Sequence, residues 1–228
     1  MPRRARGPTS SQEVRKAVRA AVAALAANRI RSCVFGSAAC QIYGMNNRIP
    51  EDVDIVLLTN DGRDVEDIKV LVVETDDNFY LVPSTNPRAT YQKLFYLLPG
   101  RRSCKVDILL PGRATDLNIP VIPRDEVEYI DPYGDIPVMP FIPLLLMKLQ
   151  GWIDHREAVE SHKRAKVPRD VTDLFQLLRL AVDSYEFDLS HADWLPYHFL
   201  ETAGERVEVF VEKHPESTTY WREIGFDI

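Results

Sequence analysis

Two aspartates stand two residues apart at the start of an apolar run, Asp52 and Asp54 in "PEDVDIVLL", residues 50–58. Aspartate is a poor strand former, and an ionised carboxylate is costly to bury without a partner. Because side chains alternate along a strand, both acids point to the same side, about 7 Å apart. A third acid, Asp107, lies within another apolar run, "KVDILL". If the two strands are neighbours, the three carboxylates converge.

Three converging carboxylates repel one another unless a divalent cation neutralises them. Carboxylate oxygens suit Mg²⁺, which leaves its remaining positions to water and substrate phosphates. Two ions held by shared aspartates form a clamp for in-line displacement at phosphorus. The pattern therefore predicts a two-ion magnesium site at Asp52, Asp54 and Asp107, with Mn²⁺ as the alternative ion.

A small-residue turn, "FGSAACQIYG" at residues 35–44, precedes the acidic pair. Gly36 would let the backbone approach a phosphate closely, and N–H groups at the start of the following helix, near Ser37, would donate to it. A Gly–Ser pair before a helix is more often a simple turn, and an Asp-x-Asp pair can be a strand end that faces solvent. The combined order of turn, helix and two acidic strands is more specific than either feature.

The elements that must position these residues follow from local patterns. Ser10 and Glu13 have capping-box spacing before an Ala-rich amphipathic helix over 13–29. Residues 63–73 favour a helix but could also form a strand, and "VEYIDPYGDIPVM" favours a hairpin that turns at "DPYG". Strands are expected at 32–35, 53–58, 79–83, 93–98 and 104–110. We expect the aromatic residues of 79–83 and 93–98 in the core and not as surfaces on which bases stack.

From Phe141 onward the patterns become helical, at 143–155, 170–184 and 194–213. The predicted fold class is α+β, a mixed sheet flanked by helices and followed by a C-terminal helical region. The predicted domain ranges are a disordered basic tail over 1–10, a core over 11–140 and the helical region over 141–228.

Composition limits the class of protein. The 228 residues are 45% hydrophobic and 27% charged, as in a soluble globular protein. No run approaches the about 18 apolar residues of a membrane span, and the basic start lacks the apolar stretch of a signal peptide. The three cysteines have no metal-ligand spacing, which favours reduced thiols in the cytoplasm. A net charge of −6 disfavours a globally basic nucleic-acid binder, although the basic segment 163–169 could contact RNA.

At "VFGS", "DVDIVLL" and "KVDILL" the chain resembles the DNA polymerase β-like nucleotidyltransferase superfamily, over about residues 30–110. The resemblance implies the nucleotidyltransferase fold, with Asp52 and Asp54 as metal ligands. It also implies that Asp107 completes the site and helps to deprotonate the acceptor hydroxyl. Gly36 and Ser37 would bind the phosphates of the nucleotide. The gap between Ser37 and Asp52 is slightly long for the superfamily.

The C-terminal half, with "LLLMKLQGW" and "RDVTDLFQLL", is similar to minimal nucleotidyltransferases. These include abortive-infection toxins and some antibiotic nucleotidyltransferases, and "KLQGWIDHR" is also similar to uncharacterised nucleotidyltransferase-like proteins of filamentous fungi. The similarity implies that Lys148 binds the triphosphate and that Asp173 supports the site, with Asp170 as a neighbouring candidate. Arg169 stands where the pattern often has lysine, which leaves the subfamily open. On the residues alone, Lys148 could equally extend from an apolar helix face to solvent.

We therefore expect a cytoplasmic, Mg²⁺-dependent nucleotidyltransferase that transfers a nucleoside monophosphate from an NTP, with release of pyrophosphate. The base of the NTP stays open, with ATP among the candidates, and the acceptor is RNA or tRNA, a small molecule or a protein. One alternative is a non-catalytic nucleotide-binding or interaction protein that retains the fold. Another is a phosphotransferase or nuclease that applies the same metal chemistry to a different bond.

Overall fold

The structure, a computed structural model, describes residues 9–58, 62–84, 86, 89–112, 115 and 117–228. These residues form two compact units. The first contains the described chain up to Ile42 together with Ile49–Met139, and the second contains Tyr43–Arg48 and Pro140–Ile228. Residues 1–8 of the predicted basic tail lie outside the described residues, whereas Ser10 is described and caps the first helix.

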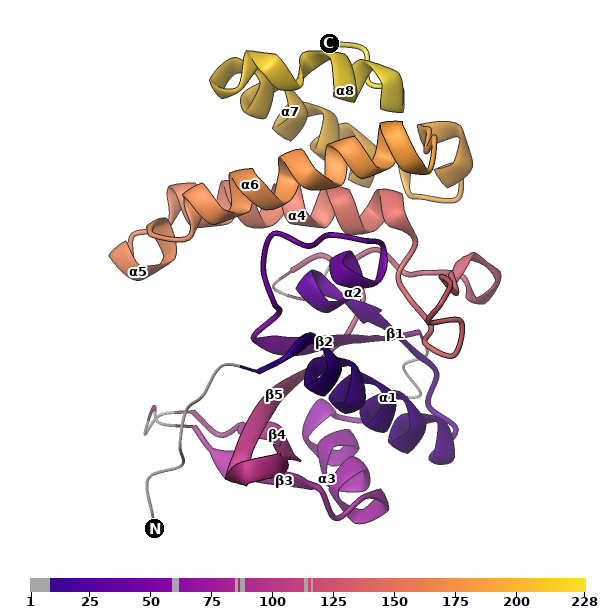
Figure 1. Cartoon of the computed structure of the whole chain (residues 1–228), viewed down its shortest axis with the longest axis vertical. Coiled ribbons are helices and arrows are strands. Elements are labelled where there is room, and N and C mark those ends of the chain that lie inside the picture. Colours follow the sequence, from indigo (N-terminus) through magenta and orange to yellow (C-terminus); the bar gives the residue numbers. More distant parts are fainter. Residues whose placement is uncertain (1–8, 59–61, 85, 87–88, 113–114, 116) are drawn as a thin grey trace. The chain divides into compact units, whose positions relative to one another are not determined.

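A five-stranded mixed sheet in the order β1-β2-β5-β4-β3 forms the first unit (Figure 1). β2 and β5 run parallel, whereas the other neighbouring pairs are antiparallel. The strands are β1 (Ser32–Phe35), β2 (Asp52–Leu57), β3 (Phe79–Pro83), β4 (Gln92–Leu98) and β5 (Arg102–Leu109). The predicted α+β class is confirmed, and so are the five predicted strands.

One face of this sheet is apolar and is covered by α1 (Ser11–Ala27) and α3 (Val65–Thr75), which lie side by side (Figure 1). Val53, Leu94 and Val106 point to this face and are buried. Their neighbours in each strand alternate to the opposite face. The covered face supplies much of the core of the unit, and the opposite face carries both polar and apolar side chains.

Capping residues explain where these helices begin. α1 starts with the predicted capping box, in which the Ser10 N–H donates to the Glu13 carboxylate at 2.9 Å and the Glu13 N–H donates to the Ser10 hydroxyl at 3.2 Å. The segment that could have been helix or strand is the helix α3, because Asp64 caps it by accepting from the Glu66 N–H at 2.9 Å. α2 (Gly36–Ile42) follows β1 directly and packs against β1 and β2.

The predicted hairpin over 127–139 is wrong, because only one bridged pair forms. Glu128 and Val138 exchange hydrogen bonds of 3.0 and 2.8 Å. Residues 137–139 direct their other bonds to Val34 of β1, whose N–H donates to the Pro137 carbonyl at 2.8 Å and whose carbonyl accepts from Met139 at 2.9 Å. Along this segment Val138 faces Glu128, whereas the Pro137 carbonyl and the Met139 N–H face β1, and no further bridged pair forms between the two arms within residues 127–139. The segment therefore extends the sheet beside β1 and does not form a hairpin of its own.

Helices make up the second unit, and the predicted C-terminal helical region is confirmed. The helices are α4 (Phe141–Glu157), α5 (Ser161–Arg164), α6 (Val167–Arg179), α7 (Tyr197–Lys213) and α8 (Thr218–Ile224). Trp152 of α4 lies edge-on to Phe210 of α7 with 4.9 Å between ring centroids, and Phe210 also contacts Trp221 of α8. These three buried rings lie in the core of the unit.

The structure also contains single turns of other helix types. They are 3₁₀ turns at Pro99–Arg101, Arg124–Glu126, Leu189–Ala192 and Pro215–Ser217, and a π turn at Leu180–Ser184. Within the described ranges, no helix combines the length and the apolar character needed to cross a membrane.

Candidate functional site

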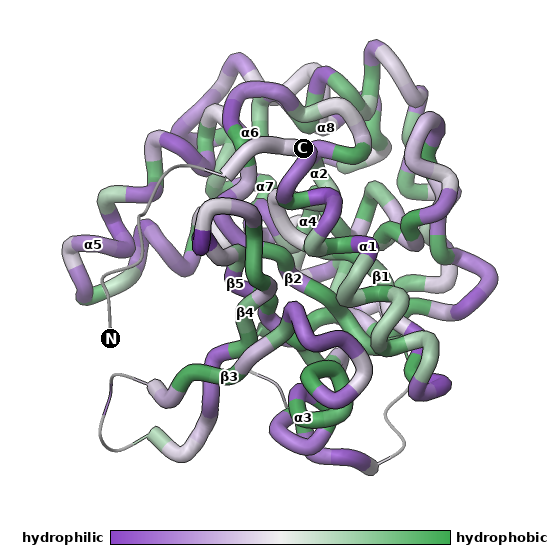
Figure 2. The backbone as a smooth tube through the Cα atoms, turned by 60° about the horizontal axis from the view of Figure 1, so that its bottom comes forward, coloured by the Kyte–Doolittle hydropathy of each residue, from purple (hydrophilic) through white to green (hydrophobic). Residues whose placement is uncertain are grey.

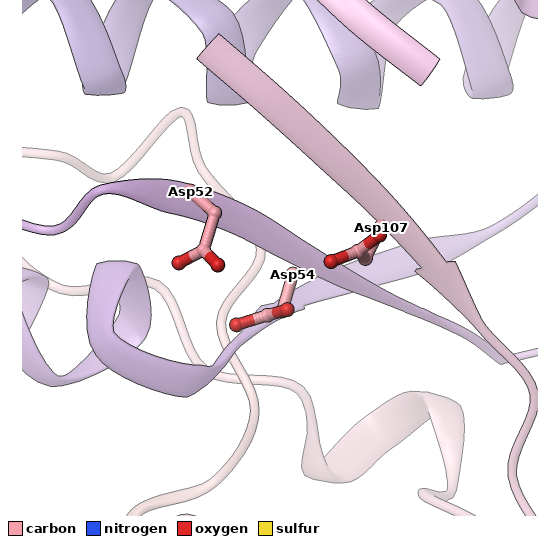
Figure 3. A group of neighbouring side chains, drawn as sticks. All are labelled: Asp52, Asp54 and Asp107. Atoms are coloured by element: carbon pink, nitrogen blue, oxygen red, sulfur yellow. The ribbon is translucent and has the colours of Figure 1, made fainter. Parts of the chain in front are cut away.

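The three predicted acids meet on the open face of the sheet. β2 and β5 are parallel neighbours, and their register makes Asp54 the partner of Asp107. One carboxylate oxygen from each of Asp52, Asp54 and Asp107 lies within 4.8 Å of the other two, and the carboxylates point toward one another (Figure 3). All three residues are half-buried. This set of oxygens, with access to water and substrate, matches the ligands that a hard divalent cation prefers.

Lys105, which the sequence analysis did not single out, belongs to the same cluster. Its Nζ lies 2.5 Å from Oδ2 of Asp107, and its register partner on β2 is Asp52. Burial lowers the pKa of this ammonium group, but the hydrogen bond to Asp107 and the charges of Asp52 and Asp54 outweigh burial, so the pKa lies above its usual value. A cation of the chain therefore offsets part of the acidic charge. Its position two residues before Asp107, on the same strand face, was the available signal.

Gly36 lies directly against the acidic cluster. Its φ is +64°, a conformation that suits glycine, and a Cβ at this position would lie 2.1 Å from Oδ2 of Asp54. Phe35, the preceding residue, is the register partner of Asp54 in the β1–β2 pair. Gly36 and Ser37 are both buried at the start of α2. The turn that the sequence singled out is thus in contact with one of the predicted metal ligands.

The two other predicted site residues, Lys148 and Asp173, contact each other in the second unit. The Asp173 side chain is completely buried, and its Oδ2 lies 3.1 Å from Lys148 Nζ. Arg48 donates to both carboxylate oxygens at distances of 2.8–3.1 Å, and Asn47 Nδ2 donates to Oδ1 at 2.7 Å. Burial alone would raise the pKa of Asp173, but the hydrogen bond from Arg48, the charge of Lys148 and the bond from Asn47 lower it below its usual value.

Asp170, the neighbouring candidate, has a different partner. Its Oδ2 lies 2.6 Å from Nδ1 of His155, and both side chains are mostly buried. Asp170 and Asp173 are three residues apart on α6, yet they hold different basic groups. Of the two acids, Asp173 is the one that contacts Lys148.

The predicted basic segment 163–169 runs from the end of α5 into the start of α6, where the chain is mostly hydrophilic (Figure 2). Lys163 pairs with Glu160 at 2.9 Å. Arg164 donates to the carbonyls of Ala158 and Val159 at 2.7 and 2.5 Å, just beyond the end of α4. Part of the basic charge of this segment is therefore used to hold the connection between α4 and α5.

The aromatic residues of β3 and β4 divide between the two faces of the sheet. Phe79 and Tyr96 are buried, which confirms the expectation of core residues. For Tyr80 and Phe95 that expectation is wrong, since alternation places them on the open face, where they are half-buried. Their rings stack with centroids 5.7 Å apart and an interplanar angle of 17°.

Solved structures with a similar fold support this architecture. An antigenic nucleotidyltransferase-like protein from Paracoccidioides brasiliensis matches with a TM-score of 0.69 at 17% identity, and the match covers 95% of each chain. JHP933 from Helicobacter pylori matches with a TM-score of 0.50 at 18% identity, over 97% of this chain and 83% of that chain. At these identities the likeness shows the fold.

Sequence comparison identifies the family. No curated protein sequence matches this chain. The sequence model described as "Nucleotidyl transferase AbiEii toxin, Type IV TA system" matches residues 41–217, which is most of the chain. That range includes the three acids as well as Lys148 and Asp173. The chain therefore belongs to the AbiEii family of nucleotidyltransferases.

Proposed function

We propose that this protein transfers a nucleoside monophosphate from an NTP to an acceptor hydroxyl, with release of pyrophosphate, in a reaction that depends on Mg²⁺ or Mn²⁺. The observation that carries the proposal is the meeting of Asp52, Asp54 and Asp107 within 4.8 Å in a chain of a nucleotidyltransferase family. Three like charges at this spacing cost stability, and they suit a divalent cation that would offset them.

The donor set fits such a cation because it consists of carboxylate oxygens that are half-buried and still reachable by water. Asp52, Asp54 and Asp107 would hold it. Divalent ions bound in this way polarise the α-phosphate and favour the ionised form of the acceptor hydroxyl.

The residues of the chain take separate roles in the transfer. The acceptor oxygen forms a bond to the α-phosphorus, and the bond between that phosphorus and the pyrophosphate oxygen breaks. Asp107 accepts the proton of the acceptor hydroxyl. The backbone at Gly36 and Ser37, which lies against Asp54, holds the phosphates of the NTP.

For Lys148 we propose a contact with the triphosphate. The support is its similarity in position to the lysine of minimal nucleotidyltransferases, and its ion pair with the buried Asp173. That pair restricts the lysine to one orientation, which lowers the entropy cost of binding a phosphate. Asp173 is then a positioning residue that acts through Lys148.

We also propose that the protein acts in a reducing compartment, namely the cytoplasm. All three cysteines are buried, and none of them forms a disulfide. Burial raises the pKa of Cys33 and of Cys104 to about 12, so these thiols stay protonated and unreactive.

Label transfer tests the proposed reaction. With α-³²P-labelled NTPs and total RNA, protein and small-metabolite fractions as acceptors, we expect label in one fraction and no label from γ-³²P-labelled NTPs. EDTA should abolish transfer, and added Mg²⁺ or Mn²⁺ should restore it. Transfer of γ-label, or transfer that continues in EDTA, would contradict the proposal.

In the same assay, Lys148→Met should raise the NTP concentration needed for half-maximal rate, and an unchanged value would remove Lys148 from the NTP site.

Gly36→Ala is expected to lower the rate of transfer by about 100-fold, which is the effect of a displacement of about 1 Å at a reacting centre. The new Cβ would lie 2.1 Å from Oδ2 of Asp54, so that carboxylate must move. The left-handed backbone also costs roughly 1–2 kcal/mol of stability when a side chain is added. Initial rates and urea unfolding measure the two effects.

Gly100→Ala is the matched control for this variant. Gly100 has a φ of +71°, but a Cβ there would have no heavy atom within 4 Å. The control should therefore lose a similar amount of stability and keep the rate of the wild type. If Gly36→Ala and Gly100→Ala have the same rate, the contact between Gly36 and Asp54 has no role in catalysis.

A further inference from the structure

A row of side chains crosses the open face of the sheet, starting at the acidic cluster. Asp52 of β2 is the register partner of Lys105 of β5, Lys105 is the partner of Phe95 of β4, and Phe95 is the partner of Tyr80 of β3. Register partners point to the same face, and neighbouring strands lie about 4.8 Å apart, so the row extends about 14 Å from Asp52. The order along the row is acid, cation, aromatic ring, aromatic ring.

The three residues beyond Asp52, which we call the acceptor row (Lys105, Phe95 and Tyr80), are partly exposed, although the hydroxyl of Tyr80 is buried. Lys105 is 36% exposed, and the two rings are half-buried. The side chains beside the rings are unusually exposed for apolar residues, at 40% for Leu97 and 36% for Val82. The face around the row is thus apolar and open to solvent, although the opposite face of the same strands forms the core.

Lys105 retains hydrogen-bonding capacity. An ammonium group has three N–H donors, and the hydrogen bond to Asp107 uses one of them. A second cation, Lys93, lies two residues before Phe95 on the same face of β4 and is half-buried. Two cations beside two stacked rings form a surface for a ligand that carries both phosphates and planar bases.

We propose that the acceptor row binds the unpaired end of a single-stranded nucleic acid and thereby presents its terminal hydroxyl to the acidic cluster. This inference rests on the proposed function, and it names the acceptor class. The aromatic rings offer stacking surfaces that any base can use, and Lys105 binds a backbone phosphate between the rings and the acids. The order of the row matches the order of groups in such an end, in which a hydroxyl is followed by a phosphate and by bases.

Charge favours an unpaired strand over a duplex. Bases in a duplex are stacked on one another and do not expose their faces to protein rings. Recognition of a duplex depends on many phosphate contacts, whereas this chain has a net charge of −6 and two lysines on the face in question. A short contact, with stacking as its main contribution, is the arrangement that these residues support.

Binding of a fluorescein-labelled ten-nucleotide uridine RNA in Mg²⁺ buffer, followed by anisotropy, tests the acceptor row. The double variant Tyr80→Leu/Phe95→Leu should bind at least about tenfold more weakly, because each lost stacking contact costs roughly 5- to 150-fold in affinity. Two phosphate contacts predict a slope of about −1.4 for log K against log salt, and Lys105→Met should reduce it by about 0.7. Controls are Tyr129→Leu, an exposed tyrosine beyond the β1 edge, and Lys16→Met on α1.

A gain of signal makes the test independent of damage to the fold. Phe95→Trp keeps an aromatic ring, so it should bind at least as tightly as the wild type, and its added fluorescence should be quenched by the RNA. Tyr129→Trp should show no quenching of its added fluorescence. Equal affinity of the double variant and the wild type, or equal quenching in the two Trp variants, would overturn the acceptor row and point to a small-molecule or protein acceptor.

The binding test and the label-transfer test fail separately. If the double variant loses RNA binding but no NTP yields α-label transfer, the acceptor row stands and the proposed reaction is wrong. If label is transferred to another fraction and RNA binding does not depend on the row, the reaction stands and the acceptor class is wrong.

Discussion

Asparagine in place of Asp54 is expected to reduce the rate of nucleotidyl transfer by about a thousandfold or more. Asp54 is the register partner of Asp107 and contacts the Gly36 turn, so it stands at the centre of the cluster. Asparagine has nearly the same shape but carries no charge, and loss of one preorganised electrostatic partner costs about 10²–10³ in rate even where no metal is involved. Initial rates of α-label transfer measure the effect.

Thermal unfolding separates a functional acid from a structural one. In EDTA, Asp54→Asn should melt at the same temperature as the wild type or higher, because one of three neighbouring like charges is gone. The matched control is Asp67→Asn, an exposed aspartate on α3, which covers the opposite face of the sheet. A rate near that of the wild type in a folded Asp54→Asn protein would remove this residue from the active site.

Asp173→Asn is expected to destabilise the protein by about 3–5 kcal/mol, the cost of removing one partner from a buried ion pair. The Asp173 side chain is completely buried and holds Arg48 through both oxygens, together with Asn47 and Lys148. The variant leaves two mostly buried cations without their counter-ion. Urea unfolding measures the loss. Lys148→Met should cost clearly less, because Asp173 keeps Arg48 and Asn47, and equal losses would contradict this account.

The pH dependence of that loss has a defined sign. The pKa of Asp173 in the folded chain lies below its usual value of 3.8. The unfolded chain therefore binds its proton first as the pH falls, and the stabilisation by Asp173 is complete above about pH 5 and is lost as the pH falls through the folded pKa. The difference in unfolding free energy between the wild type and Asp173→Asn should shrink below pH 3.8.

Local patterns were sufficient for most of the fold. The capping pair Ser10 and Glu13 located the start of α1, and runs of β-branched and aromatic residues located the strands. The spacing of apolar residues over 63–73 suited a helix or a strand, and the cap at Asp64 explains why the segment is a helix. The predicted hairpin failed because Pro137 and Met139 bond to Val34 of β1, about a hundred residues earlier in the chain, and only Val138 pairs with the other arm. A distant partner of this kind leaves no trace in a local pattern.

The candidate site was predictable to the extent that one strand contains it. Alternation along β2 was enough to place Asp52 and Asp54 on one face. That β5 is the neighbour of β2 could not be predicted, because β3 and β4 precede β5 in the chain but lie beyond β5 in the sheet. The apolar run around Asp107 made it the third candidate, and the resemblance to the nucleotidyltransferase superfamily implied its role. This superfamily assignment is confirmed. Lys105 was missed although its partner Asp107 lies only two residues away on the same strand face, whereas the stacking of Tyr80 on Phe95 is identified only when β3 and β4 pair.

The six residues Tyr43–Arg48 belong to the helical unit, although sheet residues precede and follow them in the chain. The polypeptide therefore passes between the two units three times, after Ile42, after Arg48 and after Met139. No single backbone cut releases both halves intact. A fragment that stops near residue 140 would carry Asn47 and Arg48 away from Asp173, and the remaining helices would keep a buried acid without the guanidinium that binds both of its oxygens. Proteolytic nicking at that point should consequently unfold the helical part as well.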